Sequence, residues 1–349
     1  MNYDNFNREV KRGVEKIISE EFCDGVVAIR NVTKNNNVRM KAISIVRKDE
    51  RATPTIYLRT FYMQYKEGRK IDDICEEIYN IYQKGVEGFK SDLDINDLSD
   101  IGKVENHIYY KIINYDLNRK LLTQIPHFRF KDLAIVFYIL INNDYNGQAT
   151  AIIYNQHLEA WKITQDRLRD IAFNNTWNAF PPIIRKMEDI IYDMIINDIV
   201  EDDEKQECYD EYDCEQNYDE ESEDFKDIRE STLYNDCESE EVRGIIKEEI
   251  EKLKSDRGME MYVLTNTAKI NGATCITYPG VIRQFANEHE SDVYIIPSSI
   301  HEVILIPKVD WEKEDINKLI NEVNEEQVDP VEVLSDHVYI YRIETGEIE

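Results

Sequence analysis

Two short clusters of Ser, His and Asp hold the residues that could do nucleophilic chemistry. Ser298, Ser299 and His301 share one turn between two strand-like runs, and Asp336 precedes His337 at the start of another strand. A hydroxyl nucleophile, a histidine base and an orienting carboxylate are the parts of a serine hydrolase. Ser298 or Ser299, His301 and Asp336 are therefore the candidate catalytic residues.

The same residues also have a structural interpretation. Turn hydroxyls often cap backbone groups, and a histidine that opens a strand can hydrogen-bond within its sheet. The G-x-S-x-G elbow of many hydrolases does not occur in the sequence. Because a triad is defined by geometry, a pocket shared by turns 297–301 and 335–337 would favour an enzyme, and separate surface turns would exclude it.

Other motifs of cofactor and metal chemistry fail at particular positions. Neither phosphate-loop pattern occurs, and the nearest approach, Gly85-Val86-Glu87-Gly88, places an acid where phosphate would lie. His301-Glu302 begins like a zinc-protease motif, but Leu305 stands where its second histidine belongs. No two cysteines form a C-x-x-C pair. We therefore expect no cofactor and no metal site.

The elements that must position these residues alternate between hairpins and helices. Strand-like runs at 26–32 and 38–46 flank the turn residues 34–37 and predict a β-hairpin. Nine consecutive apolar residues, 133–141, predict a central strand buried on both faces. The pattern favours an α+β fold with mostly antiparallel sheets built from hairpin-plus-helix units.

Two local expectations follow from proline and turn chemistry. Pro182 suits the first turn of a helix that would carry Ile184 and Met187 on its apolar face. Residues 273–277, after Asn271-Gly272, are expected to form a strand.

Composition divides the chain into three regions. We expect an N-terminal α+β subdomain at 1–105 and a main α+β body in two halves, 106–197 plus 259–349. Between the halves, 198–258 is expected to be an acidic, disordered or loosely helical insertion that ends in a short helix. Residues 198–241 hold 21 acids and three bases, a net of −18, which leaves −11 of the chain's −29.

Charge and cysteine usage limit the partners and the compartment. A net charge of −29 over 349 residues argues against direct nucleic-acid binding. No apolar run approaches the roughly 20 residues of a membrane helix, and the first six residues lack the apolar core of a signal peptide. Free thiols in a reducing cytoplasm best explain the six unpatterned cysteines, and Cys75 lies on the apolar stripe of a predicted helix.

The N-terminal end departs from the overall acidity. Residues 1–60 hold 12 bases and eight acids, which is locally +4. This end could receive the acidic segment or an anionic partner; an ordinary surface of mixed charge is the alternative.

Five sequence blocks stand out along the chain: 54–58, 126–127 with 132–136, 261–266, 297–302 and 333–339. Together and in this order they resemble a bacterial family of unknown function, domain of unknown function 5688. The resemblance covers nearly the whole chain except the acidic segment. It implies a bacterial cytoplasmic protein and supplies no activity, cofactor or catalytic residue. The strand-Pro-turn-His-acid-strand element and the Asn-to-Pro junction are also similar to domain of unknown function family 1444.

Three functional hypotheses remain at this point. The leading one is a non-enzymatic protein-interaction module with an unidentified protein partner. The second is a hydrolase with its site near Ser298, His301 and Asp336. The third is an acidic inhibitor that mimics DNA, in which spaced carboxylates imitate phosphates.

Overall fold

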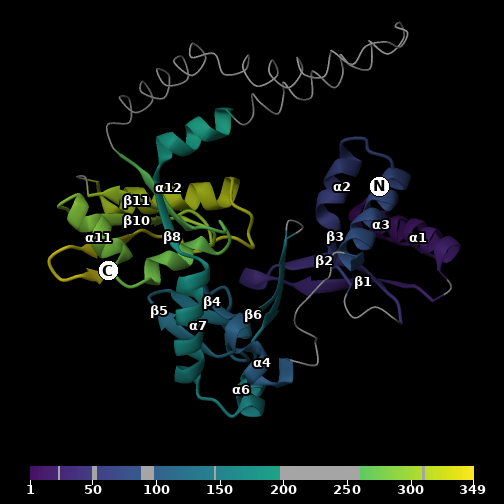
Figure 1. The fold of residues 1–349 in the computed structure, drawn as a ribbon. Coiled ribbons are helices and arrows are strands. Elements are labelled where there is room, and N and C mark those ends of the chain that lie inside the picture. Colours follow the sequence, from purple (N-terminus) through teal and green to yellow (C-terminus); the bar gives the residue numbers. More distant parts are fainter. Residues whose placement is uncertain (23, 49–52, 88–97, 145–146, 197–259, 309–310) are drawn as a thin grey trace, which may run out of the picture.

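The computed structural model describes residues 1–22, 24–48, 53–87, 98–144, 147–196, 260–308 and 311–349 (Figure 1). The expected acidic insertion at 198–258 lies outside the described residues. The fold is α+β, and every pairing of neighbouring strands is antiparallel. The predicted fold class is thereby confirmed.

An N-terminal unit packs three helices on one face of a three-stranded sheet, sheet A. Phe6, Val10 and Val14 recur at helical spacing along the first helix and are fully buried. Gly13 allows that helix to approach the third one, because a side chain at this position would collide with Cys75. Sheet A has the order β1-β2-β3. The elements are α1 (Tyr3–Glu21), β1 (Val26–Thr33), η1 (Asn35–Asn37), β2 (Arg39–Val46), β3 (Ile56–Tyr57), α2 (Leu58–Lys66) and α3 (Ile71–Glu87).

The central sheet, sheet B, is built around one long strand, β6 (Leu133–Asp144). Residues 133–140 of β6 are all buried, which confirms the predicted central strand. Strand β4 lies along one side of β6, and β5 and β7 pair with its two ends on the other side. The remaining elements of this part are α4 (Ile101–Val104), η3 (Glu105–His107), β4 (Ile108–Asn114), α5 (Arg119–Leu122), β5 (His127–Phe130), β7 (Gly147–Ile152), α6 (Asn155–Trp161) and α7 (Gln165–Ala179).

The third sheet, sheet C, has six strands in the order β13-β12-β10-β11-β9-β8. The chain leaves it at β8 and returns at β9, its direct neighbour, with Lys186 opposite Tyr262. The elements are β8 (Pro182–Lys186), β9 (Tyr262–Asn266), η5 (Gly272–Thr277), α11 (Val281–Glu288), β10 (Val293–Pro297), β11 (Val303–Pro307), α12 (Lys313–Glu326), β12 (Tyr339–Arg342) and β13 (Glu347–Ile348).

Two local predictions were wrong. Pro182 begins strand β8 rather than a helix, and helical structure starts only at Met187. Proline lacks a donor, and it fits here because β8 is an edge strand. Residues 272–277 form a 3₁₀ helix instead of the expected strand. There, Asn271 adopts a left-handed backbone (φ 53°) that starts the tight turn.

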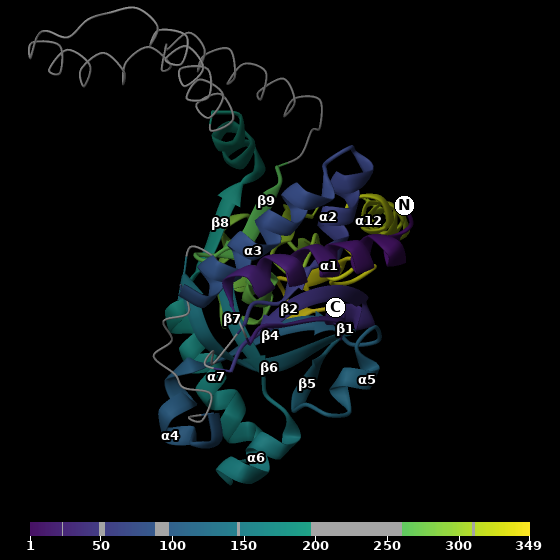
Figure 2. The ribbon, with the colours of Figure 1, turned by 90° about the vertical axis from the view of Figure 1, so that its right-hand side faces the viewer.

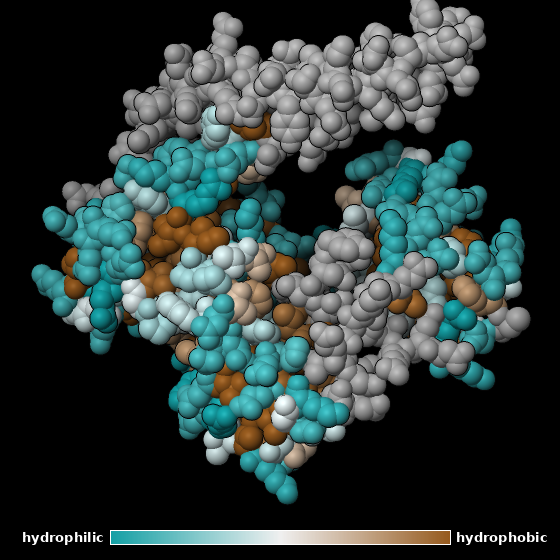
Figure 3. All heavy atoms as spheres, viewed as in Figure 1, coloured by the Kyte–Doolittle hydropathy of each residue, from teal (hydrophilic) through white to brown (hydrophobic). Residues whose placement is uncertain are grey.

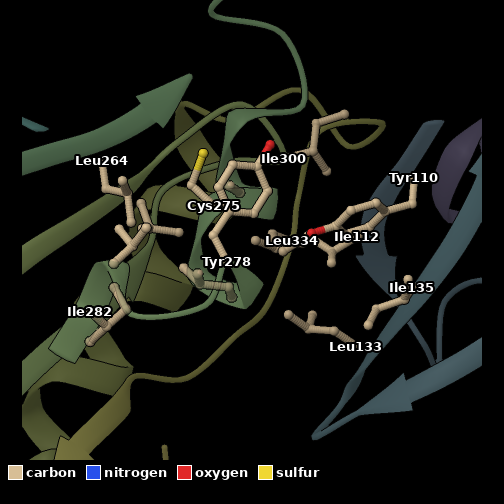
Figure 4. Close-up of a cluster of buried hydrophobic side chains, with 14 of the residues drawn as sticks. Tyr110, Ile112, Leu133, Ile135, Leu264, Cys275, Tyr278, Ile282, Ile300 and Leu334 are labelled. Atoms are coloured by element: carbon tan, nitrogen blue, oxygen red, sulfur yellow. The ribbon is translucent and has the colours of Figure 1, made fainter. Parts of the chain in front are cut away.

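The largest hydrophobic core lies between sheets B and C. Figure 4 shows Tyr110, Ile112 and Ile135 of sheet B facing Tyr278 and Leu334 of the C-terminal part. The Tyr110 ring stacks on Phe173 with centroids 4.1 Å apart, and its hydroxyl lies 3.0 Å from Thr277 Oγ1. One face of sheet B is therefore filled by this core.

The other face of sheet B points toward the N-terminal unit. In Figure 2 the β1–β2 hairpin lies over β4 and β6, while α1 to α3 cover the far side of sheet A. Figure 3 shows mainly hydrophilic residues on the N-terminal unit and a hydrophobic patch bordered by hydrophilic residues on the C-terminal part, with a hollow between the two parts. The hairpin is thus the part of the N-terminal unit that meets the central sheet.

Candidate functional site

The turn that carries Ser298, Ser299 and His301 connects β10 to β11 and is held by backbone hydrogen bonds. Ser299 Oγ accepts from the His301 N–H at 3.0 Å, and Thr265 Oγ1 donates to the His301 carbonyl at 2.8 Å. The ring nitrogen His301 Nδ1 accepts from the Asn271 N–H at 3.2 Å. These contacts fix the turn against the start of η5.

The candidate catalytic residues are not joined by hydrogen bonds. Among the described residues, neither Ser298 nor Ser299 bonds to a histidine ring nitrogen, and no ion pair joins His301 to Asp336. The second ring nitrogen of His301 lies 3.5 Å from Glu332 instead. The hydrolase hypothesis at these positions therefore lacks geometric support and stays a prediction.

A second polar cluster forms around Asp132, in the turn between β5 and β6. Ser335 Oγ donates to Asp132 Oδ2 at 2.8 Å, and the Tyr339 hydroxyl donates to Asp132 Oδ1 at 2.6 Å. His337 Nε2 lies 3.4 Å from the same carboxylate, and His337 Nδ1 lies 2.7 Å from Asp336 Oδ1. Burial and the nearby Asp132 charge raise the pKa of Tyr339, which keeps its hydroxyl protonated as a donor.

This cluster contains Ser, His and Asp but differs from a catalytic triad. In a triad the serine and the acid use opposite nitrogens of the imidazole. Here Ser335 and Asp336 both approach Nδ1 of His337, at 3.4 and 2.7 Å, and the Ser335 hydroxyl donates to Asp132. Ser335 is also fully buried. The cluster thus ties strand β12 of sheet C to the β5–β6 turn of sheet B.

Asp132, Asp336 and His337 are also the residues that could hold a metal ion. One ligand atom from each lies within 4.8 Å of the others. Both Asp132 oxygens accept hydroxyl hydrogen bonds, however, and Asp336 is exposed. Their mutual hydrogen bonds explain the arrangement without a cation.

The predicted hairpin turn has a larger role than a reversal of the chain. Asn36, in a left-handed conformation (φ 58°), donates through its side-chain amide to the carbonyls of Pro330 and Val333, at 2.9 and 2.7 Å. Its backbone N–H and side-chain oxygen bond to Asn118, beside α5. The turn therefore docks the N-terminal unit onto the other two sheets.

A cavity of about 600 Å³ opens beside this docked turn. Its walls come from the β1–β2 hairpin, the outward face of sheet B, the α5 segment and the chain around 331–332. Four cationic side chains line it, and the acidic side chain in its lining is Glu332, which faces His301. The four cations are Lys34, Arg39, Lys111 and Lys120.

Lys111, one of these four cations, has a pKa that its surroundings shift clearly. Lys111 is part-buried on β4, and its ammonium lies 5.7 Å from the Tyr138 ring. Burial and the nearby Lys34 charge lower the pKa of Lys111 to about 8. Within the described part of the chain, no ion pair or hydrogen bond neutralises the side chains of Lys34, Arg39, Lys111 or Lys120. The cavity is therefore cationic in a strongly acidic protein.

The sequence did not predict this cavity. It showed an excess of bases in residues 1–60, for which the acidic segment, an anionic partner and an ordinary surface of mixed charge were alternatives, and Lys34 and Arg39 belong to that excess. Lys111 and Lys120 lie in other elements, and only the folded chain brings them near the hairpin. The available signal was Lys111 itself, a charge between Tyr110 and Ile112 in an otherwise apolar strand.

The fold and the site define an α+β protein of three antiparallel sheets with a cationic cavity between two of them. The family model described as "Family of unknown function (DUF5688)" matches residues 3–343. The chain belongs to this family, as the sequence blocks predicted, and the similarity to family 1444 stays a prediction. No curated protein and no solved structure matches the chain. No helix among the described residues combines the length and apolarity needed to span a bilayer.

Proposed function

We propose that the protein is a non-enzymatic binding protein whose ligand is an anion held in the cavity between sheets A and B. The observation that supports this most is the convergence of Lys34 and Lys111. They come from different elements, the charge of Lys34 acts on Lys111, and no described carboxylate pairs with either.

Electrostatics explains why such an arrangement favours a ligand. A part-buried ammonium loses hydration, and a second cation nearby adds repulsion. If position 111 served only packing, we would expect an apolar residue there, or a charged residue that is paired with an opposite charge. An anion between the two lysines would offset both costs and would hydrogen-bond to both ammonium groups.

The acidity of the whole chain would restrict the ligand. The net charge of −29 repels extended polyanions, whereas a small anion can enter a local cationic cavity. The sequence led us to expect a module that binds a protein partner, whereas this proposal assigns the cavity to a small anion. A protein partner and a cytoplasmic location remain proposals, and the buried free thiols Cys75 and Cys275 support the latter.

Isothermal titration with inorganic phosphate tests the proposal. We expect binding by the wild-type chain at low ionic strength and at least a tenfold loss in Lys111→Met. Lys318→Met removes one charge from the exposed face of α12 and serves as the control. Equal binding by all three proteins, or binding by none, would contradict the proposal.

A further inference from the structure

On the sheet B side, three aliphatic residues line the cavity beside Lys111 and Thr150. Ile113, Val136 and Ile152 lie on three neighbouring strands of this sheet and line the cavity. Val136 stands directly opposite Lys111 in the β4–β6 register. Of these three residues Ile152 is part-exposed, whereas Ile113 and Val136 are almost fully buried beneath the cavity, at 2% and 1% exposure.

The α5 side of the cavity extends this apolar surface. Leu117 and Leu121 line the cavity on either side of the start of α5. Leu121 and Ile152 pack against the small core cluster that contains Ile113 and Val136. Leu117 remains 47% exposed, an unusual position for a leucine at the edge of a cationic site. Apolar surface therefore accompanies the charges around the cavity.

The size of the cavity indicates the same kind of ligand. At about 600 Å³ it falls within the range of organic ligand sites, roughly 300–1,000 Å³. Phosphate or sulfate alone would fill a small part of it and would leave the apolar surface wet. A ligand that reaches Lys111 with its anionic group lies against the exposed or part-exposed aliphatic residues of the lining, Leu117, Leu121 and Ile152.

We infer that the ligand is an amphiphilic organic anion, with one phosphate or carboxylate group and a hydrocarbon or aromatic body. This inference rests on the proposed anion-binding function. The anionic group contacts Lys34 and Lys111, and the apolar body covers Leu117, Leu121 and Ile152, the aliphatic lining residues that keep exposed surface. The cavity lies between two sheets of the protein, so the ligand is a free molecule that leaves the bulk solvent when it binds.

A chain-length series of alkyl phosphates tests this inference on the full-length protein. Titrations would compare inorganic phosphate with butyl, hexyl and octyl phosphate below their micelle concentrations. Each buried methylene contributes about 0.8 kcal/mol, so affinity should rise about fourfold per methylene until the cavity is filled. A flat series with measurable phosphate binding would overturn the inference and leave the anion site in place. Absence of binding by phosphate and by every alkyl phosphate would contradict both this inference and the proposed anion-binding function.

Two variants assign the parts of the ligand to parts of the cavity. Ile152→Ser, at a part-exposed position on β7, should lower the ratio of octyl phosphate affinity to phosphate affinity severalfold. Lys111→Met should weaken phosphate and octyl phosphate alike. Val26→Ser, at an exposed position of β1 outside the cavity, is the matched control, and urea unfolding checks that each variant folds. A gain with chain length that Ile152→Ser leaves intact would place the apolar body elsewhere and overturn the inference.

Co-sedimentation with lipid vesicles tests whether the amphiphile is a free molecule or a lipid in a bilayer. We expect the protein to bind free octyl phosphate and to remain in the supernatant with vesicles of an anionic phospholipid. Co-sedimentation that Lys111→Met abolishes would instead show that the cavity recognises a lipid headgroup in a bilayer.

Discussion

Asn36 and Asn118 exchange two hydrogen bonds across the boundary between the N-terminal unit and the central sheet. The Asn36 N–H donates to Asn118 Oδ1, and Asn118 Nδ2 donates to Asn36 Oδ1, both at 2.9 Å. Asn118 is buried, and its amide also donates to the Asn114 carbonyl at 2.8 Å. This reciprocal pair fixes the hairpin beside the cavity, so that Lys34 and Lys111 stay close.

Removal of the Asn36 side chain should loosen this junction. Asn36→Gly retains the left-handed backbone but loses three side-chain hydrogen bonds, each worth about 0.5–1.5 kcal/mol. We expect the free energy of unfolding in urea to fall by about 2–4 kcal/mol. Asn37→Gly is the control, because Asn37 has the same φ of 58° and no side-chain hydrogen bond within the described residues. Equal losses in the two variants would mean that the side-chain bonds of Asn36 contribute little.

We expect His301 to have a structural role rather than a catalytic one. Its Nδ1 accepts the Asn271 N–H, and His301→Gln should therefore cost about 1 kcal/mol of stability, as for one hydrogen bond. A fluorophosphonate probe should label neither Ser298 nor Ser299 in the wild-type chain. Labelling that disappears in His301→Gln would restore the hydrolase hypothesis.

Lys111 should make stability depend on pH in the alkaline range. Its pKa is lowered to about 8 in the fold, against roughly 10.4 in an unfolded chain. Between these values the unfolded state binds more protons, so the free energy of unfolding should rise with pH; below pH 8 the full cost of the charge is present. Lys111→Met removes this contribution. We expect the variant to be the more stable protein at pH 7, with an advantage that shrinks toward pH 10.

The measurement for Lys111 is urea unfolding of both proteins from pH 7 to 10, analysed as their difference so that other titrations cancel. A constant difference would contradict the lowered pKa. Binding of an anion should also weaken above pH 8, as the free Lys111 loses its proton. The other charged or titratable groups that contact Lys111 or line the same cavity are Lys34, Arg39, Lys120, Tyr138, Tyr154 and Glu332.

The sequence predicted the elements with strong periodicity and missed the contacts between them. Residues 133–141 are too apolar to form an exposed strand, and 133–140 are buried in β6. In α1 the buried residues recur at regular helical spacing. The Pro182 error arose because helix starts and edge strands both tolerate proline, and only strand pairing distinguishes them. The Asn36–Asn118 pair spans 82 positions, and no local pattern specifies a partner at that separation.

Ile135 offers a direct test of the central strand. It is 8% exposed on β6, between Ile112 of β4 and Phe128 of β5. Ile135→Asp would bury an unpaired charge and should prevent soluble expression. Val26→Asp makes the same chemical change at a residue of β1 that is 63% exposed, and it should express normally. Normal yield and melting of Ile135→Asp would show that this strand is outside the core.

Shortening the acidic segment should leave the described fold intact. Residues 198–241 lie outside the described residues, but the strands on either side of the segment, β8 and β9, are direct neighbours. Shortening a long connection between paired strands lowers the entropic cost of closing it, by about 0.6 kcal/mol per halving of its length. Replacement of 198–241 by about ten Gly/Ser residues should therefore preserve folding and reduce the net charge from −29 to −11. We expect the melting temperature to change by a few degrees at most, and to rise if repulsion dominates.

A Gly/Ser replacement of the full 44 residues separates the effect of charge from that of length. Insoluble or molten protein from both replacements would make the segment an integral part of the fold. Retained folding with loss of a protein partner in a pull-down would make it the binding element.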